Sequence, residues 1–240
     1  MKVSVTLDDV GISPSVNEAA SRLIEAGMVN CLSILATGSR VEEAAEIASG
    51  SDAAVSVHLN CVEPPFLSRE GFPSSHSWWF LRGASLAGDV RREWSMQVER
   101  VLSLGIMVTR LDSHRHLHHS PGLRQVILEL ASEYGISSVR AAILPDRRGS
   151  MEAMVLDRLG RKLARMAEAA GIATPDAMLG FTVSGSVDRV YLEGLEERIS
   201  GEGTAELVMH PSTVPEWSLY QPEELEMMLS DWFGRWLRAH

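Results

Sequence analysis

Short apolar runs and amphipathic stretches alternate along the whole chain. Residues 3–7 alternate with the period of two typical of a strand, and residues 14–26 have the apolar spacing of a helix. Ser13 and Pro14 are suited to begin that helix, and Gly27 is suited to end it. The same reasoning predicts further strands over 29–36, 54–59, 108–112, 138–143, 178–181 and 205–209, and further helices over 41–48, 88–104, 122–134, 151–170, 187–199 and 222–238.

This alternation determines the predicted fold class. Strands separated by helices form a parallel sheet with the helices packed outside it. Helices near both ends, without a glycine-rich phosphate loop, favour an α/β, (β/α) barrel-like, TIM-barrel-related fold. We expect about seven parallel strands with outer helices in a single domain over residues 1–240. An open doubly wound sheet is the alternative.

One segment, residues 61–86, has no regular periodicity. It is rich in proline and aromatic residues, and a connection this long inside a compact domain is usually a functional loop or lid. Its Trp78 and Trp79 could pack against sugar rings or could anchor a lid in the core. Trp232 and Trp236, four residues apart in the last predicted helix, are expected to face the core.

Charge and composition exclude several function classes. The net charge of −10 argues against binding nucleic acid through its phosphate backbone. No apolar stretch approaches the roughly 18 residues of a membrane-spanning helix, so we expect no membrane association and a cytoplasmic location. Cys31 and Cys61 have neither disulfide nor zinc-ribbon spacing, and Cys61 is expected to fill the core.

Candidate chemistry concentrates at strand ends. Four of the eight histidines lie between His114 and His119, directly after a predicted strand. Asp8 and Asp9 follow the first strand, and His58 ends another. Because the carboxyl ends of parallel strands meet at one edge, these groups should lie together. Imidazole and carboxylate groups are common metal ligands, so the sequence indicates a mononuclear metal site.

The expected geometry of the site follows from strand alternation. Asp8 and Asp9 would point to opposite faces of a regular strand, so a turn is needed, and Gly11 supplies the flexibility for it. His114 and His116 should share the face of Asp112. One carboxylate and two imidazoles leave up to three coordination positions open, which suits a Lewis-acid hydrolase. Taken singly, each of these residues could equally serve as an ordinary cap, core or loop residue.

His210-Pro211 ends the last predicted strand. A histidine facing the metal could protonate a departing amine, or it could be a structural residue before a rigid turn. The sequence leaves these two roles open.

The motifs together resemble the YdjC-like family of carbohydrate deacetylases. The matching residues lie between about residue 2 and residue 211, in the segments 6–13, 16–17, 26–29, 57–60, 111–118, 139–140 and 208–211, with Pro121. Their central pattern is DD-x-G-x-S, then H-L-N, then D-S-H-x-H-x-H. The combination is specific, whereas each piece alone is weak.

The resemblance implies a barrel-like hydrolase that removes acetyl groups from N-acetylated saccharides with a divalent metal ion. It assigns the metal to Asp9, His58 and His114, the general base to Asp8 and a second catalytic role to His210. It also suggests a homodimer. Magnesium is the first choice of ion, with zinc, manganese or cobalt as alternatives. The chain departs from the family pattern at Val10, at residues 61–63 and in the Trp78–Trp79 loop, all of which border the substrate side.

Other functions use the same residues. The protein could hydrolyse another amide, or it could be a non-catalytic, metal-containing sugar-binding protein. Two histidines and one carboxylate also describe non-haem iron oxygenases. The adjacent Asp8 argues against an oxygenase, because oxygen chemistry does not need such a base.

Overall fold

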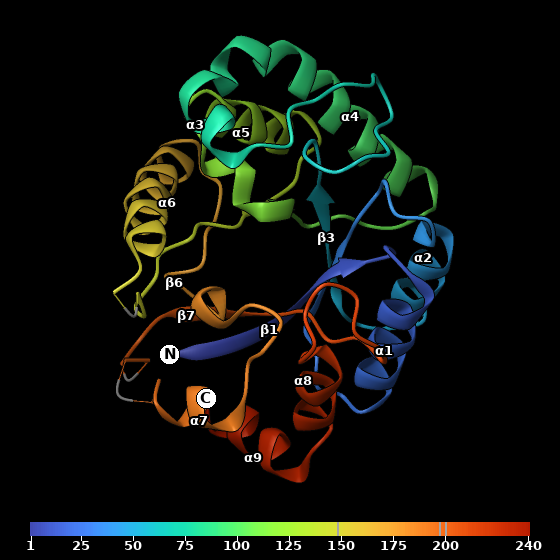
Figure 1. The fold of residues 1–240 in the computed structure, drawn as a ribbon, viewed down its shortest axis with the longest axis vertical. Helices are drawn as coiled ribbons and strands as arrows, with labels where there is room; N and C mark the ends of the chain where they lie inside the picture. The colour runs from blue at the N-terminus through green and yellow to red at the C-terminus, as the bar shows by residue number, and fades with distance from the viewer. Residues whose placement is uncertain (148, 197, 200) are drawn as a thin grey trace.

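Parallel strands form one curled sheet at the centre of the molecule, and helices surround it (Figure 1). The computed structural model describes residues 1–147, 149–196, 198–199 and 201–240. The strands are β1 (Lys2–Val10), β2 (Cys31–Ile34), β3 (Ala54–Leu59), β4 (Arg110–Ser113), β5 (Ser138–Val139), β6 (Ala177–Leu179) and β7 (Thr204–Met209). The helices are α1 (Pro14–Glu25), α2 (Val41–Ser49), α3 (His76–Arg82), α4 (Ala87–Ser103), α5 (Leu123–Glu133), α6 (Met151–Ala169), α7 (Arg189–Glu193), α8 (Gln221–Met228) and α9 (Asp231–Ala239). Single 3₁₀ segments are η1 (Gly83–Leu86), η2 (His114–His119) and η3 (Phe181–Val183).

The strand order identifies the fold as barrel-like. The sheet runs β5-β4-β3-β2-β1-β7-β6, and every pairing in it is parallel. Its two edges approach each other, since Val139 N donates to Ala173 O at 2.9 Å and Met178 N donates to Ile143 O at 2.8 Å. An open doubly wound sheet would keep its edges apart, so the barrel prediction is confirmed.

Alternation along the strands separates an apolar layer from a polar interior. On β1, Val5 and Leu7 belong to the main apolar core. Asp8 lies on the opposite face and contacts buried Arg140. Most barrels of this kind fill their interior with apolar layers, whereas here buried charges and hydroxyls occupy much of it. The polar interior therefore contacts the candidate site, since Arg140 pairs with Asp8.

The first helix follows the predicted capping chemistry. The Ser13 hydroxyl accepts a hydrogen bond from Val16 N at 3.3 Å, and Pro14 is the first helical residue. The chain leaves the helix through Gly27, whose φ of 68° is costly for residues with a side chain.

The two ends of the chain lie close together. Val3 N donates a hydrogen bond to His240 O at 3.0 Å (Figure 1).

Three predicted elements differ from the structure. The strand expected over 138–143 ends at Val139, because the next carbonyl accepts from a histidine side chain instead of a strand N–H. The helix expected over 222–238 is two helices, because the Ser230 hydroxyl accepts from Phe233 N and begins α9. The helix expected over 187–199 shortens to α7, and one of its residues, 197, lies outside the described chain.

The irregular segment contains a short helix that packs inward. Trp79 on α3 is fully buried, donates its ring N–H to Pro73 O at 2.7 Å and packs against Phe72. Trp78 lies edge-on to Trp79. Trp79 is therefore a core anchor rather than a sugar platform. Trp236 is buried as expected, and Cys61 is a buried free thiol. Among the described residues, no helix has the length and apolar character to cross a membrane.

Candidate metal centre and active site

A cavity of about 560 Å³ lies at the carboxyl ends of the strands. It contains all five residues that the sequence singled out for metal binding and catalysis. Its lining residues are Asp8, Asp9, Ile12, His58, Glu63, His114, Arg115, His116, Glu152, Phe181, Ser184, His210 and Trp217. Those five residues come from β1, β3, η2 and the position after β7, so the fold gathers them from distant parts of the sequence.

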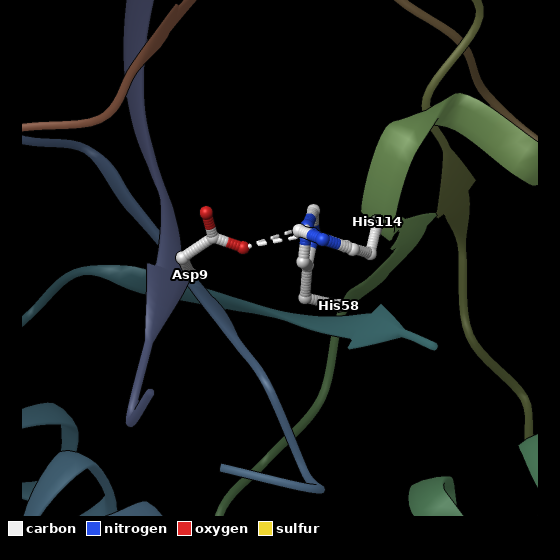
Figure 2. A group of neighbouring side chains, drawn as sticks. All are labelled: Asp9, His58 and His114. Atoms are coloured by element: carbon white, nitrogen blue, oxygen red, sulfur yellow. Dashed lines mark hydrogen bonds and ion pairs between the residues drawn. The ribbon is translucent and has the colours of Figure 1, made fainter. Parts of the chain in front are cut away.

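Three ligand atoms from Asp9, His58 and His114 converge at one point (Figure 2). Asp9 Oδ1 lies 3.0 Å from His114 Nδ1 and 3.3 Å from His58 Nε2. The two imidazole nitrogens are 3.3 Å apart. A cation about 2.1 Å from each ligand holds neighbouring ligands about 3.0 Å apart in an octahedron or about 3.4 Å apart in a tetrahedron. The triangle therefore fits a divalent metal ion.

A break in β1 brings Asp8 and Asp9 to the same cavity. Asp9 has a φ of 61°, and the pairing register of β1 with β2 shifts between Leu7 and Val10. The turn that the sequence required is thus present, but it begins at Asp9 itself, ahead of Gly11 with its φ of 95°. A left-handed aspartate costs about 1–3 kcal/mol, and such strain is concentrated at functional sites.

His58 is oriented by a buried carboxylate on its far side. His58 Nδ1 contacts Asp112, which also accepts hydrogen bonds from the hydroxyls of Ser33 and Ser56. Asp112 is 1% exposed. Because Asp112 holds the proton on Nδ1, Nε2 is the nitrogen that faces Asp9 and would bind a metal ion.

His114 has a second carboxylate, located at the rim. Glu63 Oε2 lies 3.4 Å from His114 Nε2, and the Glu63 side chain is 42% exposed. Glu63 also pairs with Arg115. The Asn60 side chain fixes the Glu63 backbone, accepting from its N–H at 3.2 Å and donating to its carbonyl at 2.6 Å. This arrangement leaves His114 Nδ1 free to bind a metal ion.

The other three histidines of the cluster have different positions. The strand stops at Ser113, and both Arg115 and His116 have a φ of 53°, so His116 does not continue the face of Asp112 as expected. Its ring lies 5.5 Å from that of Phe181, and it is not part of the ligand triangle. Within the part of the chain that the structure describes, His116 Nδ1 is buried without a hydrogen-bond partner.

His118 and His119 are structural. His118 accepts from the Ser113 hydroxyl at 2.6 Å and donates to Arg140 O at 2.9 Å. Burial lowers the pKa of His118 to about 4. His119 accepts from Ala142 N at 2.9 Å. These two rings connect η2 to the segment that follows β5, and this connection fixes the position of His114.

Asp8 is held by a fully buried arginine. Arg140 donates to both carboxylate oxygens of Asp8, each at 2.7 Å. Arg140 also pairs with Glu206 at 3.0 Å, and Glu206 pairs with Arg110 at 2.9 Å. Burial opposes the charge of Arg140, but the carboxylates of Asp112, Asp8 and Glu206 raise its pKa well above the usual value. Asp8 is thus a rigid carboxylate beside the metal triangle.

His210 lies beside Asp8 in the same cavity. Its Nε2 lies 3.8 Å from Asp8 Oδ2, and its Nδ1 is 3.2 Å from the Ser184 hydroxyl. Glu224 accepts from the His210 backbone N–H at 2.6 Å. Burial lowers the pKa of His210, although Asp8 and Asp9 oppose that shift. Trp217 packs edge-on against the ring at 5.3 Å.

Comparison with known proteins identifies the family of this chain. The model of the YdjC-like protein family matches residues 2–239. The chain belongs to the YdjC-like family. It is 32% identical to a mouse protein named carbohydrate deacetylase over 246 residues, covering 88% of this chain and 78% of the relative. It is also 29% identical over 142 residues to the chitooligosaccharide deacetylase of Escherichia fergusonii, covering 55% of this chain and 56% of that one.

A crystal structure from Enterococcus faecalis V583 has the same fold. It superimposes with a TM-score of 0.70 at 23% sequence identity, covering 99% of this chain and 94% of the other. A lower similarity, with a TM-score of 0.51 at 15% identity, relates the chain to the lactam utilization protein of Thermus thermophilus, covering 95% of each chain. Both similarities concern the fold alone.

The electrostatics of this YdjC-like protein favour a bound cation. Burial lowers the pKa of His58, but Asp8 and Asp112 outweigh it and raise the pKa to about 10. Burial is likewise outweighed at His114, where Asp9 contributes most to a pKa of about 9. The negative potential that holds these protons also attracts a divalent ion, which would replace them.

Several supporting residues were not singled out as site residues from the sequence. Arg140, Glu63 and Trp217 lie in segments whose functional role periodicity does not reveal. Arg140 did carry two signals. It is a charged residue in a predicted interior strand, where such residues need a partner, and it lies in segment 139–140, which matches the family pattern. Trp217 lies in a connection without regular spacing, and only the structure brings it to His210.

Proposed function

We propose that this protein is a divalent-metal-dependent hydrolase that removes the N-acetyl group from an acetylated saccharide, such as a chitooligosaccharide. The observation that carries the proposal is the triangle of Asp9, His58 and His114 directly beside the Asp8–Arg140 pair. An open metal face next to a fixed carboxylate suits amide hydrolysis. The names of the mouse and Escherichia fergusonii relatives support the saccharide assignment.

In this proposal Asp9, His58 and His114 hold the ion. Magnesium is the first choice, and zinc, manganese and cobalt also suit a set of one carboxylate and two imidazoles. When bound, the ion supplies a Lewis acid that polarises the acetamide carbonyl and lowers the pKa of water. Asp112 and Glu63 hold the two imidazoles in the correct orientation.

Asp8 acts as the general base. Its carboxylate removes a proton from the attacking water, and the water oxygen forms a bond to the acetyl carbon. Arg140 holds both carboxylate oxygens, so the base is fixed before the substrate arrives. A positioned base of this kind contributes about 10²- to 10⁴-fold in rate.

His210 protonates the departing amine. The bond between the acetyl carbon and nitrogen breaks, and the nitrogen receives a proton from His210 Nε2, which gives acetate and a free amino sugar. His210 Nε2 lies 3.8 Å from Asp8 Oδ2, so one bridging water would carry the proton that Asp8 took back to the imidazole and restore the imidazolium. Because burial lowers its pKa, the protonated ring is a stronger acid than free imidazolium.

The wider proposal covers the organisation of the protein. We propose a single domain over residues 1–240, a cytoplasmic location and a homodimer. Light scattering of the purified protein tests the dimer directly, because a monomer has a mass of 26.3 kDa.

Acetate release from N-acetylglucosamine oligomers tests the activity. The protein is first stripped with a chelator and then supplied separately with magnesium, zinc, manganese or cobalt. We expect release to stop after stripping and to return with one of these ions. If no ion restores release although each binds stoichiometrically, the substrate is a different amide or the protein is a non-catalytic sugar binder.

A further inference from the structure

A second cavity, of about 240 Å³, lies beside the catalytic cavity. The two cavities share four lining residues, which are Arg115, His116, Glu152 and Phe181. A molecule bound at the metal triangle can therefore extend across this shared border. The second cavity is called the side cavity below.

The far walls of the side cavity are apolar. Phe80 from α3 lines one side, and Met151, Val155 and Leu156 from the first turns of α6 line the other. Met151 is 80% exposed and Val155 is 49% exposed. Apolar side chains left exposed at the edge of a functional cavity indicate a binding surface more often than isolated ones do.

The border with the catalytic cavity is rigid. Arg115 and His116 both have left-handed backbones, which turn the His116 ring onto Phe181. Two consecutive residues with positive φ are costly and persist only when their surroundings hold them. The charged groups of Arg115 and Glu152 lie on this border, whereas the walls beyond it carry no charge.

We propose that the side cavity binds an apolar aglycone of the acetylated sugar, that is, an aryl or alkyl group attached to it. This inference rests on the proposed deacetylase function and names the class of substrate. A second sugar ring would bring hydroxyl groups that need hydrogen-bond partners, and the side chains of Phe80, Met151, Val155 and Leu156 provide none. A volume of about 240 Å³ accommodates one aromatic ring or a short alkyl chain.

Four substrates and two matched variants test this inference. The substrates are N-acetylglucosamine, its phenyl and octyl β-glycosides, and N,N′-diacetylchitobiose. Val155→Glu places a charge in the side cavity. Met154→Glu is the control, because Met154 is the neighbouring residue on α6, is similarly exposed at 54% and does not line the cavity.

We expect kcat/KM for a glycoside with an apolar group to exceed that for N-acetylglucosamine by about ten-fold, mainly through KM. Val155→Glu should abolish this ratio and leave N-acetylglucosamine turnover unchanged, whereas Met154→Glu should preserve the ratio. A gain with the phenyl glycoside indicates a small aromatic glycoside, and a gain with the octyl glycoside indicates a lipid-linked sugar; either supports the inference.

Two results would overturn the inference while leaving the deacetylase function intact. One is a gain with chitobiose alone, which assigns the side cavity to a second sugar. The other is a Val155→Glu variant that lowers kcat/KM equally for all substrates. If no substrate releases acetate, the proposed function fails, and calorimetric binding of the phenyl glycoside tests the side cavity on its own. Equal affinity of the wild type and Val155→Glu would then reject it.

Discussion

The two metal-facing histidines are supported by carboxylates in very different surroundings. His58 leans on Asp112, which is 1% exposed and receives hydrogen bonds from two serine hydroxyls. His114 leans on Glu63, whose side chain is 42% exposed and shared with Arg115. The chemistry of the two pairs is the same, but one belongs to the barrel interior and the other to the rim.

The difference shows how one site combines rigidity with access. In the interior, water cannot screen the charges, and the hydroxyls of Ser33 and Ser56 that donate to Asp112 are fixed by β2 and β3. At the rim, solvent screens the Glu63 charge, and the side chain can move when a substrate enters. The buried pair therefore determines the geometry of the site, and the rim pair tunes it.

Asp8→Asn should cause the largest fall in turnover, because it removes the buried general base without removing a metal ligand. We expect turnover to fall by about 10²- to 10⁴-fold while metal still binds. Calorimetric metal titration together with acetate release measures both. His114→Ala is the contrast, since it should lose metal and activity together. An Asp8→Asn enzyme with full activity would exclude Asp8 as the base.

Asp112→Asn should show how much the buried pair contributes. An amide cannot match all the donors around it, so His58 loses its preferred tautomer and Arg140 loses a nearby countercharge at 3.4 Å. We expect metal affinity to fall by about 100-fold and the free energy of unfolding to fall by about 3 kcal/mol.

Ser33→Ala is the matched control for Asp112→Asn. It removes one hydrogen bond to the carboxylate but keeps the charge, so metal affinity should fall by less than about ten-fold. Metal titration and urea unfolding of both variants separate the two effects. Equal losses would mean that the hydroxyl network, rather than the carboxylate charge, orients His58.

The sequence was sufficient to predict the framework of this molecule. The period of apolar residues predicted the parallel barrel, and the ends of strands predicted Asp9, His58 and His114 as neighbours, because parallel strands deliver their last residues to one edge. Capping chemistry at Ser13 also predicted the start of α1 correctly. Each of these features depends on short-range pattern.

Long-range pairing could not be predicted in the same way. Arg140 and Asp8 are 132 positions apart, and nothing local indicates that their charges meet. The turn at Asp9 and the left-handed pair Arg115–His116 depend on tertiary contacts that outweigh the local backbone preference. For that reason the alternation of side chains along a strand predicted the wrong position for His116.

The free energy of unfolding should depend on pH because η2 contains the buried ring of His118. The pKa of His118 is about 4 in the folded protein and about 6.5 in an unfolded chain. The unfolded state therefore binds more protons between these values, and stability falls as the pH falls below about 6.5. For this residue we expect a loss of about 2 kcal/mol between pH 7 and pH 5.

Urea unfolding at the two pH values measures that loss, with chelator present so that metal binding does not contribute. His118→Asn should be less stable at pH 7 but should show a smaller decrease on acidification. Burial also lowers the pKa values of His116 and His119, so some pH dependence should remain. If His118→Asn lost as much unfolding free energy between pH 7 and pH 5 as the wild type, the His118 ring would not be the cause of the loss.

Glu63→Gln should have the smallest effect and compares the two carboxylates most directly. Since solvent screens Glu63, we expect metal affinity to fall by about ten-fold in low salt and by less in high salt, clearly less than for Asp112→Asn. Glu152→Gln is the control, because it removes a carboxylate from the same cavity without touching the His114 pair. Calorimetric titrations at two salt concentrations measure the difference. Glu63→Gln could instead lower metal affinity as much as Asp112→Asn does, by the same factor at both salt concentrations. In that case exposure would not distinguish the two pairs, and the rim would fix the geometry as firmly as the interior.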